Sequence, residues 1–307
     1  MGEKHMRKIL VTGGTVFVSR SLAEYFVAKG DEVYVLNRNH KKQSEGVKLI
    51  EADRYKLGTV LSDYQFDVVI DANAYTAEEV NLLLEALPEI KDYVFISTSA
   101  VYPEHLSQPF KETQIVGPNS YWKDYGTNKI EAEELIAKKV PQGYMLRPAY
   151  IYGPYNNAYR EAFIFDCAKA KRPFYLPQSS DMKLQFIHIH DLCRLVDELL
   201  EKKPEEKIYN VGNEGPVTIK EWVSMCYEVA NESLELIEVD ESVNQTSYFS
   251  FPNYEYLLDV ERQTALIGET LDLRKGLEES FEWYQTNENI VNKRNYIEFI
   301  ENEIKGD

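Results

Sequence analysis

Short apolar segments alternate with longer amphipathic segments through most of the first half of the chain. After a first apolar run at Lys8–Thr12, a helical pattern extends to Lys29, and further helical patterns occupy Glu78–Leu87 and Asn128–Lys139. Runs of strand length occupy Lys8–Thr12, Glu32–Leu36, Val47–Glu51, Val68–Ala72, Tyr93–Ser97 and Tyr144–Arg147. Because these runs are apolar throughout, the pattern predicts an α/β fold in which helices cover both faces of a doubly wound parallel sheet.

The regular alternation ends near Gly153, and the organisation of the chain is predicted from that change. Residues 6–153 form the first domain, to which residues 186–213 return as a further strand and helix. Residues 154–185 and 214–307 are expected to form mainly a smaller lobe. In open α/β sheets ligands bind at the carboxyl ends of the strands, so we expect the lobe to cover those ends and to contact the substrate.

Composition disfavours several classes of partner. The chain has 307 residues and a formal net charge of −17, without a block of Lys and Arg, so a nucleic-acid partner is not expected. No apolar run approaches the ~20 residues that cross a bilayer, so no membrane partner is expected. The three cysteines, Cys167, Cys193 and Cys226, stand singly, and no secretion signal is recognised, which predicts reduced thiols and a cytoplasmic location.

Tyr125 and Lys129 have the spacing of a proton-transfer pair. A tyrosine acts as a base near neutral pH only when a cation stabilises its phenolate, and residues four apart share one face of a helix. Tyr25 and Lys29 repeat the spacing, as chance allows in a chain with 22 tyrosines. Only Tyr125 follows a strand end rich in hydroxyls, residues 97–99, so it is predicted to serve a hydride-transfer site.

The segment Ile9–Arg20 leaves a strand through a Gly-rich turn and opens a helix, which is the context of a dinucleotide fingerprint. With the Tyr-x-x-x-Lys pair it resembles the extended short-chain dehydrogenase/reductases of the NAD-dependent epimerase/dehydratase family, and the Rossmann-like fold of that family is implied for nearly the whole chain. The family turn reads Thr-Gly-x-x-Gly-x-x-Gly. This chain keeps Gly13 but has Val16 and Ser19 at the next two glycine positions, and a tight connection without a ligand is the alternative.

The resemblance also implies where a nicotinamide cofactor binds. NAD-preferring members carry an acidic residue at the end of the second strand, whereas this chain has Asn37 and Arg38, which favours NADP over NAD. Asp53 matches an adenine-contacting aspartate. The predicted cofactor-binding residues are Gly13, Thr15, Val16, Phe17, Val18, Asn37, Arg38, Asp53, Arg54, Ala72, Asn73, Ala74, Tyr125 and Lys129.

The same resemblance implies the catalytic roles. Thr98, rather than Ser97 or Ser99, matches the hydroxyl that bridges the substrate oxygen and the phenol, with Tyr125 and Lys129 completing the catalytic set. Nucleotide-sugar dehydratases carry an Asp-Glu pair after that Thr, whereas this chain has Ser99–Ala100. Oxidation or reduction of a sugar or nucleotide sugar and epimerisation through a ketone both remain open.

The anchor for a substrate diphosphate departs from the family. Many members have an arginine ahead of the strand that matches 186–191, where this chain has Lys183, and an asparagine where it has Tyr150. The predicted substrate-contacting residues are Tyr75, Ser99, Tyr150 and Lys183, with Arg160 and Arg172 as further candidates for the diphosphate.

His188, His190 and Asp191 have a spacing that suits metal ligands, but no metal site is predicted. The two histidines are expected on one face of a strand, and Asp191 is expected to cap a helix that begins at Leu192.

Two further expectations concern partners. Because Val16 and Ser19 replace two glycines of the family turn, the alternative to an enzyme is a non-catalytic relative that binds a nucleotide, a protein or RNA. The helical segments Glu78–Leu87 and Asn128–Lys139 carry apolar residues beyond one face, so by analogy with the family they are expected to form a homodimer interface.

Overall fold

The computed structural model describes residues 6–305, which form two compact units. The first unit comprises the chain up to Ala149 together with Ile189–Gly212 and Leu258–Glu269. The second comprises Tyr150–His188, Asn213–Leu257 and the chain from Thr270 onward. Residues 258–269, which were expected in the smaller lobe, therefore belong to the first unit. Residues 306 and 307 of the expected lobe lie outside the described part.

Hydrogen bonds explain why residues 258–269 belong to the first unit. The Asn210 side-chain amide donates to the Asp259 carbonyl at 3.1 Å, and the Arg194 guanidinium donates to the Ile267 carbonyl at 2.8 Å. Both donors lie in residues 189–212, which belong to the first unit. These bonds attach residues 258–269 to the same unit.

The first unit contains a seven-stranded sheet whose paired strands are all parallel. Its order is β11-β6-β5-β4-β1-β2-β3, so the direction of winding reverses between β1 and β4. The strands are β1 (Lys8–Thr12), β2 (Glu32–Asn37), β3 (Lys48–Glu51), β4 (Val68–Asp71), β5 (Asp92–Ile96), β6 (Tyr144–Pro148) and β11 (Ile208–Val211). The predicted doubly wound fold is confirmed, and ligands bind such sheets where the order reverses.

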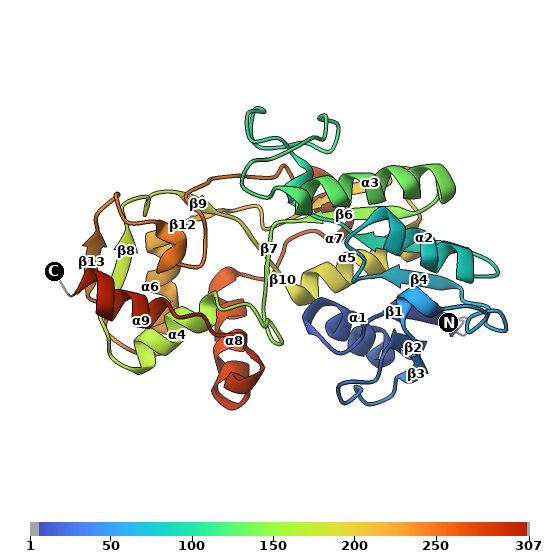
Figure 1. Ribbon diagram of the computed structural model, residues 1–307, viewed down its shortest axis with the longest axis horizontal. Coiled ribbons are helices and arrows are strands. Elements are labelled where there is room, and N and C mark those ends of the chain that lie inside the picture. The colour runs from blue at the N-terminus through green and yellow to red at the C-terminus, as the bar shows by residue number, and fades with distance from the viewer. Residues whose placement is uncertain (1–5, 306–307) are drawn as a thin grey trace. The chain divides into compact units, whose positions relative to one another are not determined.

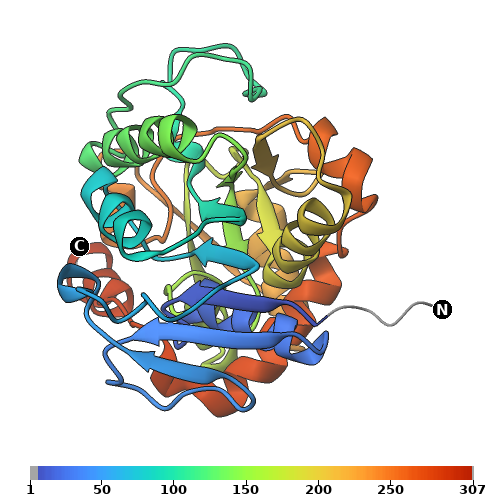
Figure 2. The same ribbon diagram turned by 90° about the vertical axis from the view of Figure 1, so that its right-hand side faces the viewer.

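Helices cover both faces of this sheet (Figures 1 and 2). On one face α2 (Ala77–Ala86) packs along α3 (Asp124–Lys139), and on the other α1 (Phe17–Ala28) packs along α5 (Ile189–Lys202), beside α7 (Glu261–Ile267). The short 3-10 helices η1 (Arg54–Lys56) and η2 (Ser99–Val101) follow β3 and β5. Within residues 6–305, no helix is both long enough and apolar enough to cross a membrane.

The apolar side chains of α2 are buried in the core of the first unit. Val80, Leu83, Leu84 and Leu87 are all buried in the core between α2, α3 and the sheet. On α3, Ile136 is buried as well, while Ile130 and Leu135 are half-buried. The surplus expected on α2 is therefore absent, and the homodimer stays a prediction that now depends on α3 alone.

The second unit is built from strand pairs and helices around an aromatic core. β7 (Tyr150–Tyr152) pairs with β10 (Phe186–His188), β8 (Phe174–Pro177) with β13 (Leu236–Val239), and β9 (Lys183–Leu184) with β12 (Val217–Thr218). Its helices are α4 (Glu161–Lys169), α6 (Ile219–Val229), α8 (Leu273–Asn287) and α9 (Tyr296–Phe299), with η3 (Gln245–Ser247), η4 (Glu288–Ile290) and the π-helical turn η5 (Ile300–Ile304).

Three expectations about residues 186–213 were wrong. β10 pairs with β7 rather than with the main sheet, since Phe186 stacks on Trp222 of the second unit, with 5.5 Å between ring centroids. Helix α5 begins at Ile189, not at Leu192, so Asp191 lies in its first turn and accepts a hydrogen bond from Arg194 at 2.6 Å. His188 therefore ends a strand and His190 lies in a helix, so they do not share a strand face.

Candidate active site

The first turn of α3 lies directly against the segment that follows β5. Tyr125 is the second residue of α3, and its side chain is 41% exposed. The next residue is Gly126, where a Cβ atom would lie 2.4 Å from the Ala100 carbonyl oxygen. Only glycine permits this approach, which brings the Tyr125 backbone close to the hydroxyl-bearing segment.

Lys129 lies one helical turn after Tyr125 and is almost fully buried, with 4% exposure. Its Nζ donates to the carbonyl oxygens of Ala74 and Ile96, both at 2.8 Å, and lies 4.7 Å from the centroid of the Phe95 ring. Burial lowers the pKa of Lys129 to about 8, although more distant carboxylates oppose the shift. The ammonium thus joins the segment after β4 to the last residue of β5, one helical turn from Tyr125.

The pair Tyr25 and Lys29 has the same spacing in α1 but different surroundings. The Tyr25 hydroxyl donates to Asp197 at 3.3 Å, and the Lys29 ammonium pairs with the same carboxylate at 3.1 Å. Burial, together with the Asp197 charge, raises the pKa of Tyr25 to about 12. This pair therefore supports the packing of α1 on α5.

The hydroxyls after β5 have different partners. The Ser97 hydroxyl donates to Glu133 at 2.5 Å, and Glu133 forms a buried ion pair with Arg147. The Thr98 hydroxyl oxygen accepts from the Ala100 amide at 3.1 Å and caps η2, of which Ser99 is the buried first residue. Since a hydroxyl that accepts a bond keeps its own proton to donate, Thr98 remains able to bind a substrate oxygen.

The Gly-rich turn after β1 accommodates one of its two departures from the family. Gly13 and Gly14 have φ of +87° and +92°, and a Cβ at Gly14 would lie 2.4 Å from the Val35 side chain. Ser19 is buried and donates to the Val16 carbonyl at 2.9 Å, so its small side chain is accommodated within the turn. The Val16 side chain is 37% exposed, so the departure at the second position stands at the surface.

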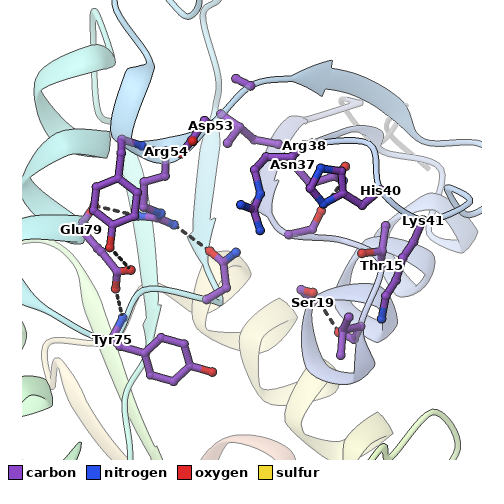
Figure 3. A pocket seen from close by; sticks show the side chains of 16 residues that line it. Thr15, Ser19, Asn37, Arg38, His40, Lys41, Asp53, Arg54, Tyr75 and Glu79 are labelled. Atoms are coloured by element: carbon purple, nitrogen blue, oxygen red, sulfur yellow. Dashed lines mark hydrogen bonds between the residues drawn. The ribbon is translucent and has the colours of Figure 1, made fainter. Parts of the chain in front are cut away.

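A cavity of about 540 Å³ opens at the carboxyl ends of the strands next to this turn (Figure 3). It contains eight of the predicted cofactor residues and one predicted substrate residue, Tyr75. Its lining consists of Gly13, Thr15, Val16, Ser19, Leu36, Asn37, Arg38, His40, Lys41, Ala52, Asp53, Arg54, Tyr55, Asn73, Tyr75 and Glu79. The structure therefore brings most of the predicted cofactor residues to one site.

The other predicted cofactor residues lie outside the lining. Phe17 and Val18 are in the first turn of α1, and the remaining four follow β4 or lie on α3: Ala72, Ala74, Tyr125 and Lys129. Helix α1 has no side-chain cap and no acidic residue in its first turn. Its first amide groups and the positive end of its dipole therefore remain suited to an anion.

One wall of the cavity is basic. Arg38, His40 and Lys41 line it (Figure 3), and none of the three forms an ion pair within residues 6–305. Asn37, where NAD-preferring relatives have an acid, donates instead to the Gly13 carbonyl at 2.7 Å. The sequence interpretation named Arg38 but missed His40 and Lys41, although both lie within three residues of it and could have been found as a basic segment after β2.

Arg54 on the opposite wall is held by the protein itself. Its guanidinium donates to both oxygens of Asp71, at 2.6 and 3.1 Å, and also to the Glu79 carbonyl and the Asn73 side chain. Asp71 is fully buried and accepts further bonds from Thr12 and Tyr93. Arg54 thus connects the end of β3 to the end of β4.

Asp53 immediately precedes η1 and caps it, because its carboxylate accepts from the Tyr55 amide at 2.9 Å. Two of the predicted substrate residues, Tyr150 and Lys183, lie in the second unit. Tyr150 is buried with its ring centroid 4.5 Å from that of Phe251, and Lys183 is exposed on β9.

Comparisons with known proteins agree with this fold. Residues 9–212 match the NAD dependent epimerase/dehydratase family. A chloroplast stem-loop binding protein of 41 kDa from Arabidopsis thaliana is 30% identical over 90% of this chain and 78% of its own length.

Solved structures are similar over nearly the whole chain. A UDP-glucose 4-epimerase of Thermotoga maritima with UDP-glucose has a TM-score of 0.75 at 18% identity, covering 91% of this chain and 99% of that one. The Bordetella bronchiseptica enzyme WbmG in complex with NAD and UDP has a TM-score of 0.76 at 16% identity, covering 94% and 97%. The chain belongs to the NAD-dependent epimerase/dehydratase family, within the extended short-chain dehydrogenase/reductases.

Proposed function

We propose that this chain is an NADP-dependent enzyme that oxidises, reduces or epimerises a nucleotide sugar, with Tyr125 as the proton-transfer residue. The observation that carries the proposal is the buried Lys129 ammonium, one turn from Tyr125 and joined to the segment before Thr98. The family and the names of the similar structures support the choice of a nucleotide sugar.

The cavity suits a dinucleotide in shape and charge. The uncapped start of α1 would hold the pyrophosphate, Asp53 the adenine, and Arg38 with His40 and Lys41 the 2′-phosphate that distinguishes NADP from NAD. When bound, the nicotinamide supplies the acceptor or donor of hydride.

The residues of the chain supply proton transfer and orientation. Tyr125 takes the proton of the sugar hydroxyl, because the nearby ammonium favours its phenolate, and Thr98 donates a hydrogen bond to the same substrate oxygen. Loss of this proton, together with transfer of hydride from the same carbon to the bound nicotinamide, would give a ketone, and return of the hydride to the other face of that ketone would invert the carbon. Ser99 and Ala100 offer no acid or base for elimination of water, so dehydration is not proposed.

Turnover tests the proposal. The protein is incubated with NADP⁺ and a panel of uridine, guanosine and thymidine diphosphate sugars, with reduced cofactor followed by absorbance and epimers by chromatography. Cofactor reduction or an epimerised product with one of the sugars supports the proposal. Failure of the protein to bind either nicotinamide nucleotide in a fluorescence titration contradicts it.

A non-catalytic binding protein is the second candidate, and the relative named for stem-loop binding is the observation that favours it. The net charge of −17 opposes a phosphate backbone as the ligand. A stem-loop RNA and NADPH titrated into the same preparation separate the candidates, since binding of the RNA alone would favour the second.

Replacing Arg38 by Ala is expected to weaken NADP(H) binding by about 1–3 kcal/mol, the contribution of charged hydrogen bonds to the 2′-phosphate. NAD(H) binding should change little, because that cofactor lacks the phosphate. Fluorescence titration of both cofactors measures the two effects. Lys42→Ala is the matched control, since Lys42 is exposed and does not line the cavity. Equal losses for the two cofactors would exclude recognition of the phosphate by Arg38.

Turnover is expected to fall as pH rises through about 8, because Lys129 loses its proton there and ceases to stabilise the Tyr125 phenolate. The ammonium is fully present below that pH, so the loss lies on the alkaline side. A pH profile of kcat in the wild type and in Lys129→Met measures it, and the variant should show low activity without this decline. Lys29→Met is the control, and an unchanged alkaline limit in Lys129→Met would show that another group titrates.

A further inference from the structure

Arg160 is a half-buried arginine without an acidic partner. It immediately precedes α4, and its guanidinium carbon lies 4.9 Å from the centroid of the Tyr150 ring and 5.6 Å from that of Phe251. Within residues 6–305 its side chain makes no ion pair and no hydrogen bond. Partial burial of a charge is costly unless an opposite charge compensates it, and the aromatic rings provide only part of that compensation.

The surroundings of Arg160 keep it in this position. The Ser250 hydroxyl donates to the Tyr159 carbonyl at 2.6 Å, which joins the segment containing Phe251 to the residue before Arg160. Glu161, the neighbouring carboxyl, does not pair with Arg160: it is buried and accepts from the Asn156 side chain at 2.9 Å. The guanidinium is thus fixed on the aromatic rings while its N–H donors remain unused.

The other candidates for an anion anchor lack this combination. Arg172 forms an ion pair with Glu301, and Arg274 forms one with Glu228. Lys183, at the position where many family members have an arginine, is exposed on β9 and has no aromatic support among the described residues. Of these side chains, Arg160 alone is positioned and unpaired.

We propose that Arg160 binds the diphosphate of the nucleotide-linked substrate, with the guanidinium held by Tyr150 and Phe251. A stacked guanidinium presents its planar fork to two phosphate oxygens at once, which an exposed lysine cannot do. The inference rests on the proposed function, because that function supplies the nucleotide sugar. It assigns Tyr150 a supporting role beneath the arginine.

Calorimetric titration tests the proposal with uridine, guanosine and thymidine diphosphates, each compared with its nucleoside. In the wild type we expect at least one diphosphate to bind more tightly than its nucleoside. In Arg160→Gln the Kd of that diphosphate should rise about 10- to 100-fold, as loss of charged hydrogen bonds predicts, while the nucleoside is unaffected. Arg160→Lys should lose part of the affinity, because it keeps the charge but not the fork.

Two controls distinguish this result from misfolding and from failure of the proposed function. Arg294→Gln removes an exposed arginine of the second unit and should bind diphosphate as the wild type does. NADPH affinity, measured in every variant, should be unchanged. Wild-type diphosphate affinity in Arg160→Gln, equal losses in both Gln variants, or a parallel loss of NADPH binding would overturn the proposal. Absence of NADPH binding in the wild type would instead contradict the proposed function, with the diphosphate result still deciding the role of Arg160.

Discussion

Replacing Tyr125 by Phe is expected to lower turnover by at least about a hundredfold, which is the usual contribution of a positioned acid or base. The ring and its contact with Tyr75, 6.2 Å between centroids, are kept, and only the oxygen that exchanges the proton is lost. Cofactor affinity should therefore change little. Steady-state kcat together with NADPH titration measures both quantities.

Tyr25→Phe is the matched control for this variant. It makes the same chemical change at the other Tyr-x-x-x-Lys pair, where the phenol donates to Asp197. We expect a small loss of stability and unchanged kcat for the folded protein. Near-normal turnover in Tyr125→Phe, or similar kinetic losses in both variants, would refute the catalytic assignment of Tyr125.

Gly126→Ala is expected to have the second large effect. The added methyl would lie 2.4 Å from the Ala100 carbonyl oxygen, so α3 and the segment after β5 must move apart. Overpacking of this kind costs about 1–3 kcal/mol of stability. A displacement of about 1 Å between reacting groups can lower turnover by roughly a hundredfold. Thermal unfolding and kcat together test the expectation.

Gly215→Ala adds the same methyl where no heavy atom lies within 4 Å, and it should leave both measurements unchanged. NADPH affinity in Gly126→Ala is the decisive additional readout. Loss of kcat with retained cofactor binding supports a change of position at Tyr125. An active, stable Gly126→Ala protein would mean that the close approach is not needed.

The sequence predicted the sheet well because its strands are apolar on both faces and bounded by polar turns. The predicted strand at Lys8–Thr12 has the observed bounds, and the others differ at their ends by a residue or two. The turn at Gly13, the pair Tyr125 and Lys129, and Arg38 were singled out because each depends on residue type at fixed spacing, and their functional roles stay predictions. These features are local, so one chain is enough to recognise them.

Features that depend on tertiary contacts were not predicted. Helix α3 begins at Asp124 rather than at the predicted Asn128. The prediction missed this first turn because Gly126 is a poor helix former. The structure has glycine there because α3 approaches Ala100 closely. The contact of Arg54 with the cofactor stays a prediction, but the buried Asp71 that holds its guanidinium was not foreseen, because it is distant in sequence. The pairing of β10 with β7 depends on the aromatic core of the second unit, which no periodicity of the strand reveals.

The function expected of the Tyr-x-x-x-Lys motif depends on the surroundings of Lys129 as well as on the spacing of the two residues. Two backbone dipoles, rather than a carboxylate, hold this ammonium, and within residues 6–305 it forms no ion pair. Its field on a neighbouring phenol is therefore not cancelled locally, whereas Asp197 cancels much of the field of Lys29. An engineer who grafts Tyr-x-x-x-Lys onto another helix must also supply two strand ends with available carbonyl groups. Without them, the graft resembles the pair of α1, whose lysine is paired with a carboxylate.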